Sequence, residues 1–434
     1  MEKTMKTTIK KWGINGEGIA YENKKAIFIP GTLPNEEVEY HIVKENEKYN
    51  IGELDRIITK SSMRRFPLCK EWLECGGCSL MAVQYKGQCR MKEQILKESL
   101  LKYAGYKGKI NPIIKNPEPL NYRNSCKLPF GYKEGKLTTG MYQRDSNHFV
   151  PLERCYVHSR LIETVRHEVE EIVKDESLFD KKTKEGFRTL VLKEFNGKVQ
   201  IIFVTGKNSI SREIIDACSK IENVVSIWQS QRVDQNNELY GKNMIHLFGE
   251  KKIKMQYNDY SFSLLPRSFF QLNTKQAFHL YEYIKSILPK SKLMVEAYSG
   301  IGAISLLAHE KAEKIIGIES IQDAVDNANE NAKNNHINNV SFICGDAGKE
   351  LKNLSNQVVD TLIVDPPRVG LDNTMKNAIL SSKIKTIIYV SCNPSTLSKD
   401  LKELGKQYRI RLVQPIDMFS QTSHVETCVL LIRK

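Results

Sequence analysis

The chain has 434 residues, 41% of them apolar and 27% charged, which is the composition of a globular protein with a sizeable buried core. Its formal charge of +14 favours a polyanionic partner such as a nucleic acid, although a Lys-rich composition alone produces the same charge. No apolar run approaches the roughly 18 residues of a membrane span, and the N-terminus lacks the apolar core of a signal peptide. We therefore expect a cytoplasmic protein without membrane contact, whose ten cysteines stay reduced and serve as metal ligands, catalysts or packing residues.

Residues 1 to about 60 consist of short alternating strands, such as 26–30 and 38–43, separated by glycine-containing turns. Strands at this spacing predict a small OB-like β-barrel, a fold that often binds nucleic acid. A β-module that only packs and binds no ligand explains the pattern equally well.

Residues 61 to about 255 have a mixed pattern. A cysteine cluster comes first, followed by a helical, Lys-rich stretch at 83–103 and by strand-like runs at 189–192 and 199–204. The segment predicts a mixed α+β central domain whose topology the pattern does not define.

From about residue 256 to residue 434, apolar strand-like runs alternate with helical stretches such as 321–335. This alternation predicts an α/β fold with a doubly wound, Rossmann-like parallel sheet. The runs at 408–416 and 425–432 have only a short connection, so we expect an antiparallel hairpin at the end of the sheet. A sheet with this ending is typical of S-adenosylmethionine-dependent methyltransferases. The five parallel strands are expected at 293–298, 314–319, 340–344, 359–365 and 385–391.

Three strand ends predict a cofactor site. The first strand leads into Tyr298-Ser299-Gly300-Ile301-Gly302, where glycines permit a tight turn close to a ligand. Glu319 ends the next strand about 20 residues later, where a carboxylate can accept hydrogen bonds from ribose hydroxyls. Asp346 follows the third strand and is placed to reach an adenine ring. We predict S-adenosylmethionine as the cofactor; a nicotinamide cofactor is the alternative, disfavoured because the third glycine of a pyrophosphate site is absent.

Two further strand ends carry reactive groups: Cys392 follows the fifth parallel strand and Glu426 opens the last strand. Carbon 5 of uracil attacks a methyl sulfonium only after a thiolate has added to carbon 6, and a base must then remove the proton from carbon 5. Alone, Cys392 fits a buried packing residue and Glu426 a solvated edge residue. Together on this sheet they predict a nucleophile and a general base.

These motifs resemble the RNA uracil-5-methyltransferase family, and most closely its bacterial 23S ribosomal RNA branch. The resemblance covers nearly the whole chain and makes residues 1–60 a TRAM domain, an RNA-binding barrel. The segments that carry it are Ser268-Phe269-Phe270-Gln271-Leu272-Asn273, Tyr298-Ser299-Gly300-Ile301-Gly302, Glu319, Asp365-Pro366-Pro367-Arg368, Ser391-Cys392-Asn393-Pro394 and His424-Val425-Glu426-Thr427.

The resemblance implies roles for individual residues. Gln271, Tyr298, Glu319 and Asp365 would contact S-adenosylmethionine or shape its site. Phe269, Gln271 and Asp365 would border the flipped uracil, with Cys392 as nucleophile and Glu426 as general base. The family's Asp-Leu-Tyr-Cys-Gly reads Glu-Ala-Tyr-Ser-Gly here, so Glu296 must replace an aspartate with one more methylene.

Four cysteines form a candidate metal site: Cys69, Cys75 and Cys78, and Cys155 far downstream. Four thiolates can hold a [4Fe–4S] cluster or a tetrahedral zinc ion, and the spacing alone does not decide between them. The resemblance to the ribosomal branch implies a [4Fe–4S] cluster, with zinc as the alternative. The other cysteines are expected to be packing residues, namely Cys89, Cys126, Cys218, Cys344 and Cys428.

The expected partner is large-subunit ribosomal RNA or its precursor, and we expect a monomer. A transfer RNA uracil-5-methyltransferase and a non-catalytic RNA-binding assembly factor are the alternatives. The barrel and the cysteine cluster favour the ribosomal substrate, because the bacterial transfer RNA enzymes that the sequence resembles typically lack both.

Overall fold

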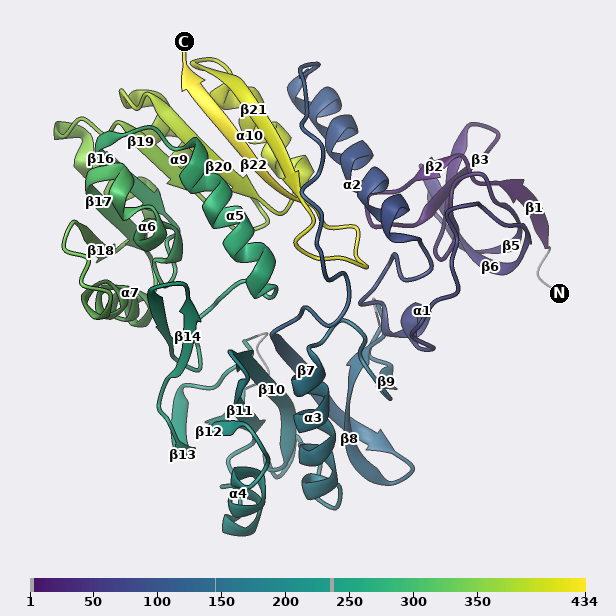
Figure 1. Ribbon diagram of the computed structural model, residues 1–434. Coiled ribbons are helices and arrows are strands. Elements are labelled where there is room, and N and C mark those ends of the chain that lie inside the picture. The colour runs from purple at the N-terminus through teal and green to yellow at the C-terminus, as the bar shows by residue number, and fades with distance from the viewer. Residues whose placement is uncertain (1–3, 145, 235–237) are drawn as a thin grey trace. The chain divides into compact units, whose positions relative to one another are not determined.

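The computed structural model describes residues 4–144, 146–234 and 238–434, and Figure 1 shows its helices and strands. The chain divides into two compact units. Unit 1 comprises residues 1–119 and 355–434, and unit 2 comprises residues 120–354. The two units meet at residues 119/120 and 354/355, so they do not test the expected domain boundaries near residues 60 and 255, which stay predictions. Within the described ranges, no helix is both long and apolar enough to cross a membrane.

Unit 1 begins with the expected β-module. Its strands pair in the order β1-β5-β6-β4-β3-β2, and apolar side chains such as Ile27, Val38 and Tyr40 form its core. The apolar residues that alternate along these strands therefore share one hydrophobic core. The strands are β1 (Met5–Thr8), β2 (Lys11–Trp12), β3 (Gly18–Glu22), β4 (Lys25–Ile29), β5 (Glu37–Glu45) and β6 (Tyr49–Thr59).

The helical stretch predicted at 83–103 is confirmed. It consists of α2 (Tyr85–Ser99), which continues into a π-helical turn, η1 (Leu100–Ala104), and ends at Gly105 with a left-handed φ of 64°. A short helix, α1 (Trp72–Cys75), precedes it.

The C-terminal part of unit 1 holds four strands with two helices. Strands β19 (Thr361–Val364) and β20 (Thr386–Ser391) run parallel. Strand β22 (Glu426–Arg433) pairs antiparallel with both β20 and β21 (Tyr408–Ile416), which confirms the predicted terminal hairpin. The helices are α9 (Asn373–Ser381) and α10 (Pro394–Leu404).

Unit 2 contains a seven-stranded sheet in the order β13-β12-β11-β10-β7-β8-β9, against which α3 and α4 pack. Its mixed α+β composition agrees with the prediction for the central segment. The elements are β7 (Ser125–Lys133), β8 (Lys136–Tyr142), β9 (Phe149–Pro151), α3 (Arg160–Val173), β10 (Phe187–Phe195), β11 (Lys198–Thr205), α4 (Arg212–Ser219), β12 (Val224–Gln231) and β13 (Asn243–Gly249).

The rest of unit 2 has the predicted Rossmann-like alternation. Strands β16, β17 and β18 are parallel, and helices alternate with them along the chain. The elements are β14 (Ile253–Tyr257), β15 (Tyr260–Leu264), α5 (Thr274–Ile287), β16 (Ser291–Ala297), α6 (Ala303–Leu307), η2 (His309–Lys311), β17 (Ala312–Glu319), α7 (Gln322–Asn334), β18 (Val340–Cys344), α8 (Ala347–Asn353) and, where the chain passes into unit 1, η3 (Leu354–Asn356).

Candidate active site

The turn after β20 places Cys392 between a strand and a helix. Strand β20 ends at Ser391, and α10 starts at Pro394. Asn393 caps this helix by accepting a hydrogen bond from the Ser395 amide at 3.0 Å, and a proline at the first helical position suits its fixed φ. Cys392 is therefore held at the carboxyl end of a buried strand, where substrates of open α/β sheets bind.

Glu426 lies beside Cys392 because of the strand register. Ser391 of β20 pairs with Thr427 of β22, so Cys392 and Glu426 are the next residues along the two neighbouring strands. Asp365 follows directly after β19, which is parallel to β20, and therefore lies at the same edge. The structure thus brings together the predicted nucleophile, the predicted base and one predicted site carboxylate.

Burial dominates the ionisation of this group. Burial, with a smaller contribution from the nearby Glu426 charge, raises the pKa of the Cys392 thiol to about 11. Burial also raises the pKa of Asp365 to about 6. The pKa of Glu426 lies well above its usual value because the carboxyl is buried and faces Asp365. Because Asp365, Glu426 and Cys392 are buried close together, the state in which all three are ionised is disfavoured.

Arg368 is the residue of this site to which the sequence pattern assigned no role. Its charge and hydrogen bonding lower the pKa of Cys392, and its charge also lowers the pKa of Glu426, in each case against the larger effect of burial. Its guanidinium Nη2 lies 3.3 Å from His424 Nε2, and its carbonyl accepts a hydrogen bond from Asn393 at 3.0 Å. In the sequence, the only indication that Arg368 belongs to the site was its position three residues after Asp365.

The predicted glycine loop of unit 2 has the backbone of a ligand-binding turn. Tyr298, Gly300 and Gly302 have φ values of 64°, 53° and 80°, a region that side chains other than glycine rarely adopt. At Gly302 an added Cβ would lie 2.3 Å from the Phe342 ring, so close packing also requires glycine there. At Gly300 an added Cβ would meet nothing within 4 Å, which leaves open space beside the backbone.

Glu319 is fastened to this loop. Its carboxylate accepts hydrogen bonds from the amides of Gly300 at 3.0 Å, Ser320 at 2.8 Å and Ile321 at 3.1 Å. The loop also holds the Ser299 hydroxyl oxygen, which is buried without a hydrogen-bond partner among the described residues. A buried orphaned hydroxyl next to open space fits a polar ligand that supplies the missing partner.

Two acidic residues of the region act as helix caps. Glu296 is buried and accepts hydrogen bonds from the amide and hydroxyl of Ser305 in α6, the amide at 2.9 Å. The Glu296 side chain, one methylene longer than the family's aspartate, therefore reaches the first turn of α6. Asp346 caps α8 by accepting from the Lys349 amide at 3.0 Å, so its predicted reach toward adenine stays a prediction.

Phe269 and Gln271 follow a turn that Lys193 holds. The buried Lys193 ammonium donates to the carbonyls of Pro266 at 2.6 Å and Ser268 at 2.7 Å. Burial lowers the pKa of Lys193 to about 7, with a further contribution from Lys127. Phe269 is 65% exposed and borders a cavity of about 150 Å³, whereas Gln271 is 9% exposed. An exposed aromatic ring on a turn held by hydrogen bonds is suited to stacking against a nucleic-acid base.

None of the four cysteines of the predicted metal site forms a disulfide bond. Cys69, Cys75 and Cys78 belong to unit 1, and Cys155 to unit 2. Among the described residues, no group of three or more His, Cys, Asp or Glu side chains could hold a metal ion. The cysteine Cys344, expected to be a packing residue, is exposed at the end of β18, which corrects that expectation.

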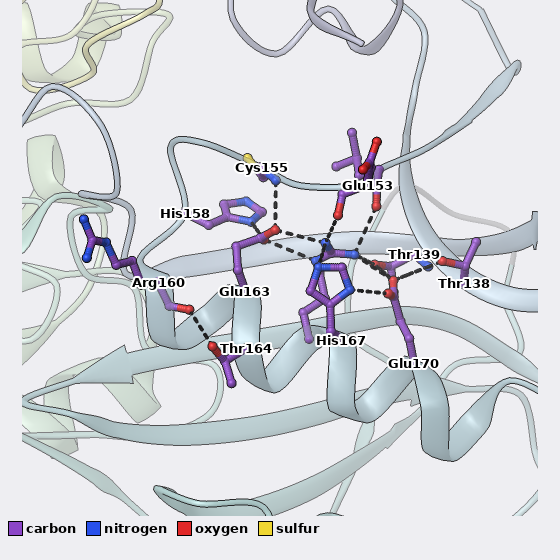
Figure 2. Close-up of polar contacts among 12 residues, drawn as sticks. Thr138, Thr139, Glu153, Cys155, His158, Arg160, Glu163, Thr164, His167 and Glu170 are labelled. Atoms are coloured by element: carbon purple, nitrogen blue, oxygen red, sulfur yellow. Dashed lines mark hydrogen bonds and ion pairs between the residues drawn. The ribbon is translucent and has the colours of Figure 1, made fainter. Parts of the chain in front are cut away.

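Cys155 lies on a loop that α3 fixes (Figure 2). Its amide donates to the Glu163 carboxylate at 2.8 Å, and His158 Nδ1 lies 2.8 Å from the same carboxylate. The fully buried Arg166 neutralises Glu163 at 2.9 Å and Glu170 at 2.9 Å. This buried charged network was not visible in the sequence, because it forms only when the loop at 155–158 packs against α3.

The chain is similar to known proteins over nearly its whole length. A family model described as tRNA (uracil-5-)-methyltransferase matches residues 84–434, and a TRAM domain model matches residues 3–54. A Lactobacillus johnsonii protein described as an uncharacterized RNA methyltransferase is 37% identical to the chain, covering 98% of it and 96% of that protein. A Clostridium tetani protein with the same description is 35% identical, covering 96% and 94%. The structure of Pyrococcus abyssi tRNA (uracil-54, C5)-methyltransferase in complex with S-adenosyl-L-homocysteine has the same fold, with a TM-score of 0.81 at 24% identity over 99% of this chain and 100% of that one.

Proposed function

Because the chain belongs to the tRNA (uracil-5-)-methyltransferase family and carries a TRAM domain, we propose that it transfers a methyl group from S-adenosylmethionine to carbon 5 of a uridine in 23S ribosomal RNA. The observation that carries the proposal is the register of β20 and β22, which sets Cys392 beside Glu426 at one strand edge. A nucleophile and a base must both reach one pyrimidine ring in this reaction.

Cys392 acts first in the proposed mechanism. Its thiolate adds to carbon 6 of the flipped uracil, and the electron pair of the former double bond makes carbon 5 nucleophilic. Burial holds the thiol protonated, and the Arg368 cation favours the thiolate. Arg368 is therefore the residue that assists ionisation, with His424 beside its guanidinium.

Glu426 completes the reaction. S-adenosylmethionine, when bound, supplies an electrophilic methyl group for carbon 5. Glu426 then takes the remaining proton from carbon 5, the double bond re-forms, and the bond between carbon 6 and the Cys392 sulfur breaks to release the thiolate. Glu426 must be ionised at this step, and its raised pKa then makes the carboxylate a stronger base than an exposed glutamate.

The cofactor would be held by the loop at Tyr298–Gly302 together with Glu319. The open space at Gly300 and the unpartnered Ser299 hydroxyl fit a polar ligand at this turn. We assign Gln271, Asp346 and Asp365 to the same site, and Phe269, Gln271 and Asp365 to the flipped base.

Ribosomal RNA is proposed over transfer RNA because the cysteine pattern resembles the ribosomal branch. Transfer RNA is the second candidate, since the Pyrococcus abyssi transfer RNA enzyme matches along 99% of this chain, barrel included. The purified protein should therefore be incubated with labelled S-adenosylmethionine and either protein-free 23S ribosomal RNA or transfer RNA, both made by transcription. We expect 5-methyluridine in the ribosomal RNA alone. Methylation of transfer RNA alone would overturn the substrate assignment.

We further propose a [4Fe–4S] cluster on Cys69, Cys75, Cys78 and Cys155, which rests on the resemblance and on the ability of four thiolates to ligate such a cluster. The anaerobically purified protein should contain iron and sulfide and absorb visible light broadly. Cys75→Ser should lose both signals, whereas Cys344→Ser, which changes an exposed thiol outside the set, should keep them. If the protein is colourless and contains zinc, the site binds the alternative metal and not a cluster.

We propose that the protein acts as a monomer in the cytoplasm.

A further inference from the structure

The loop between β21 and β22, residues 417–425, ends at Glu426 and is unusually buried. Asp417, Met418, Ser420 and Gln421 are each 0% exposed. Surface loops normally satisfy their polar groups with water, so a buried loop needs protein partners for them. These partners come from residues 65–119 of the same unit.

Gln421 is the first anchor of this loop. Its φ of 70° places it in the left-handed region, which costs a non-glycine residue free energy unless its surroundings hold it there. The side-chain amide of Gln88 in α2 makes two hydrogen bonds with Gln421. It donates to Gln421 Oε1 at 2.9 Å and accepts from the Gln421 backbone N–H at 2.9 Å. Arg65 donates to the same Oε1 at 2.7 Å.

Asp417 is the second anchor. Its carboxylate accepts from the buried Lys92 ammonium of α2, from the Tyr85 hydroxyl at 2.8 Å and from the Ser420 hydroxyl at 2.6 Å. The Lys92 ammonium also donates to the Phe419 carbonyl at 2.9 Å. The same helix therefore binds both the first residues and the centre of the loop.

The end of the loop is fixed by apolar packing. Val425, directly before Glu426, is 0% exposed and packs with Cys89 of α2 and with Ile113. One face of α2 thus contacts the loop at its start, its centre and its last residue, and the three loop residues that make these contacts, Asp417, Gln421 and Val425, are each 0% exposed.

We propose that Gln88 and Lys92 of α2 are positioning residues for the general base: they set the path of the loop that delivers Glu426 to the reacting ring. This inference rests on the proposed function. Proton removal needs the carboxylate within hydrogen-bond reach of carbon 5, and misplacement by about 1 Å can reduce a rate about 100-fold. Cys392 lies in the turn between β20 and α10, outside this loop, so we expect loosening of the loop to leave the thiol in place.

The test uses Gln88→Met in the full-length protein, with Gln94→Met as the matched control. Both changes replace an amide with a thioether of similar length on α2, but Gln88 is buried against the loop and Gln94 is exposed. Gln88→Met should form 5-methyluridine about 10- to 100-fold more slowly, mainly through kcat, and should accumulate an RNA adduct that survives denaturing gels. Gln94→Met should behave like the wild type.

A second variant covers the case in which Gln88→Met does not fold. Gln421→Gly removes the anchoring amide and keeps a backbone that tolerates a φ of 70°, and the same adduct should accumulate. Slower product in proportion to lost folded protein and without adduct, or product at the wild-type rate, would overturn the inference. If the wild type itself makes no 5-methyluridine on any RNA, the proposed function fails instead.

Discussion

Replacing Cys392 with alanine should abolish 5-methyluridine formation. Without the sulfur, no bond to carbon 6 forms, and carbon 5 stays too weakly nucleophilic to take a methyl group. Nucleoside mass spectrometry of ribosomal RNA incubated with the variant and S-adenosylmethionine measures the effect. Cys344→Ala provides the matched control, because it removes an exposed thiol at the end of another strand and should leave the rate unchanged.

The pH dependence tests the same thiol. Its pKa is raised to about 11 in the free protein, chiefly by burial, so the thiolate fraction grows with pH below that value. At limiting RNA, the rate should therefore rise by up to tenfold per pH unit on the alkaline side of neutrality, until RNA or protein stability fails.

Normal product from Cys392→Ala would remove the nucleophile assignment. It would leave a methyltransferase of another mechanism, whereas binding of cofactor and RNA without turnover by the wild type would favour the non-catalytic assembly factor.

Replacing Glu426 with glutamine should trap the enzyme on its RNA. The amide cannot take the proton from carbon 5, so the reaction stops after methyl transfer with the carbon 6–sulfur bond intact. A slowly migrating protein–RNA band on a denaturing gel should accumulate, with product formation at least 100-fold lower, in the range of about 10²–10⁴ that a general base contributes.

The matched control for this variant is Glu313→Gln, which makes the same change at an exposed residue of β17. It should turn over normally and leave no band. The double variant Cys392→Ala, Glu426→Gln should also leave none, because the band requires the sulfur. Absence of the band in Glu426→Gln, together with normal product, would show that another group takes the proton.

Much of the fold follows from local patterns. The alternation of apolar strands with helices predicted the parallel strands of the third segment, and the missing helix between 408–416 and 425–432 predicted the antiparallel hairpin. These features are readable because strand and helix periodicities depend on neighbours in the sequence. The start of β22 at Glu426 followed in the same way, since an apolar run begins there.

The reactive edge was only partly readable. Strand ends placed Cys392, Asp365 and Glu426 near one another, because the carboxyl ends of parallel strands share an edge. The role of Arg368 could not be predicted from the sequence. Its effect on the pKa of Cys392 requires the turn that carries Arg368 to lie close to Cys392, and only the folded structure shows this. The burial that raises the pKa values of Asp365 and Glu426 likewise arises only after packing.

The sequence by itself determined the succession of strands, the glycine turn and the residue types at each strand end. Only the tertiary structure decided that helix α2 holds the loop before Glu426, because Gln88 and Gln421 are 333 residues apart and neither has a local pattern that names the other. It also decided that Glu296 caps α6 and that Cys344 is exposed. Local hydrogen bonding sets periodicity, whereas the partner of a buried polar group depends on the packing of all the elements around it.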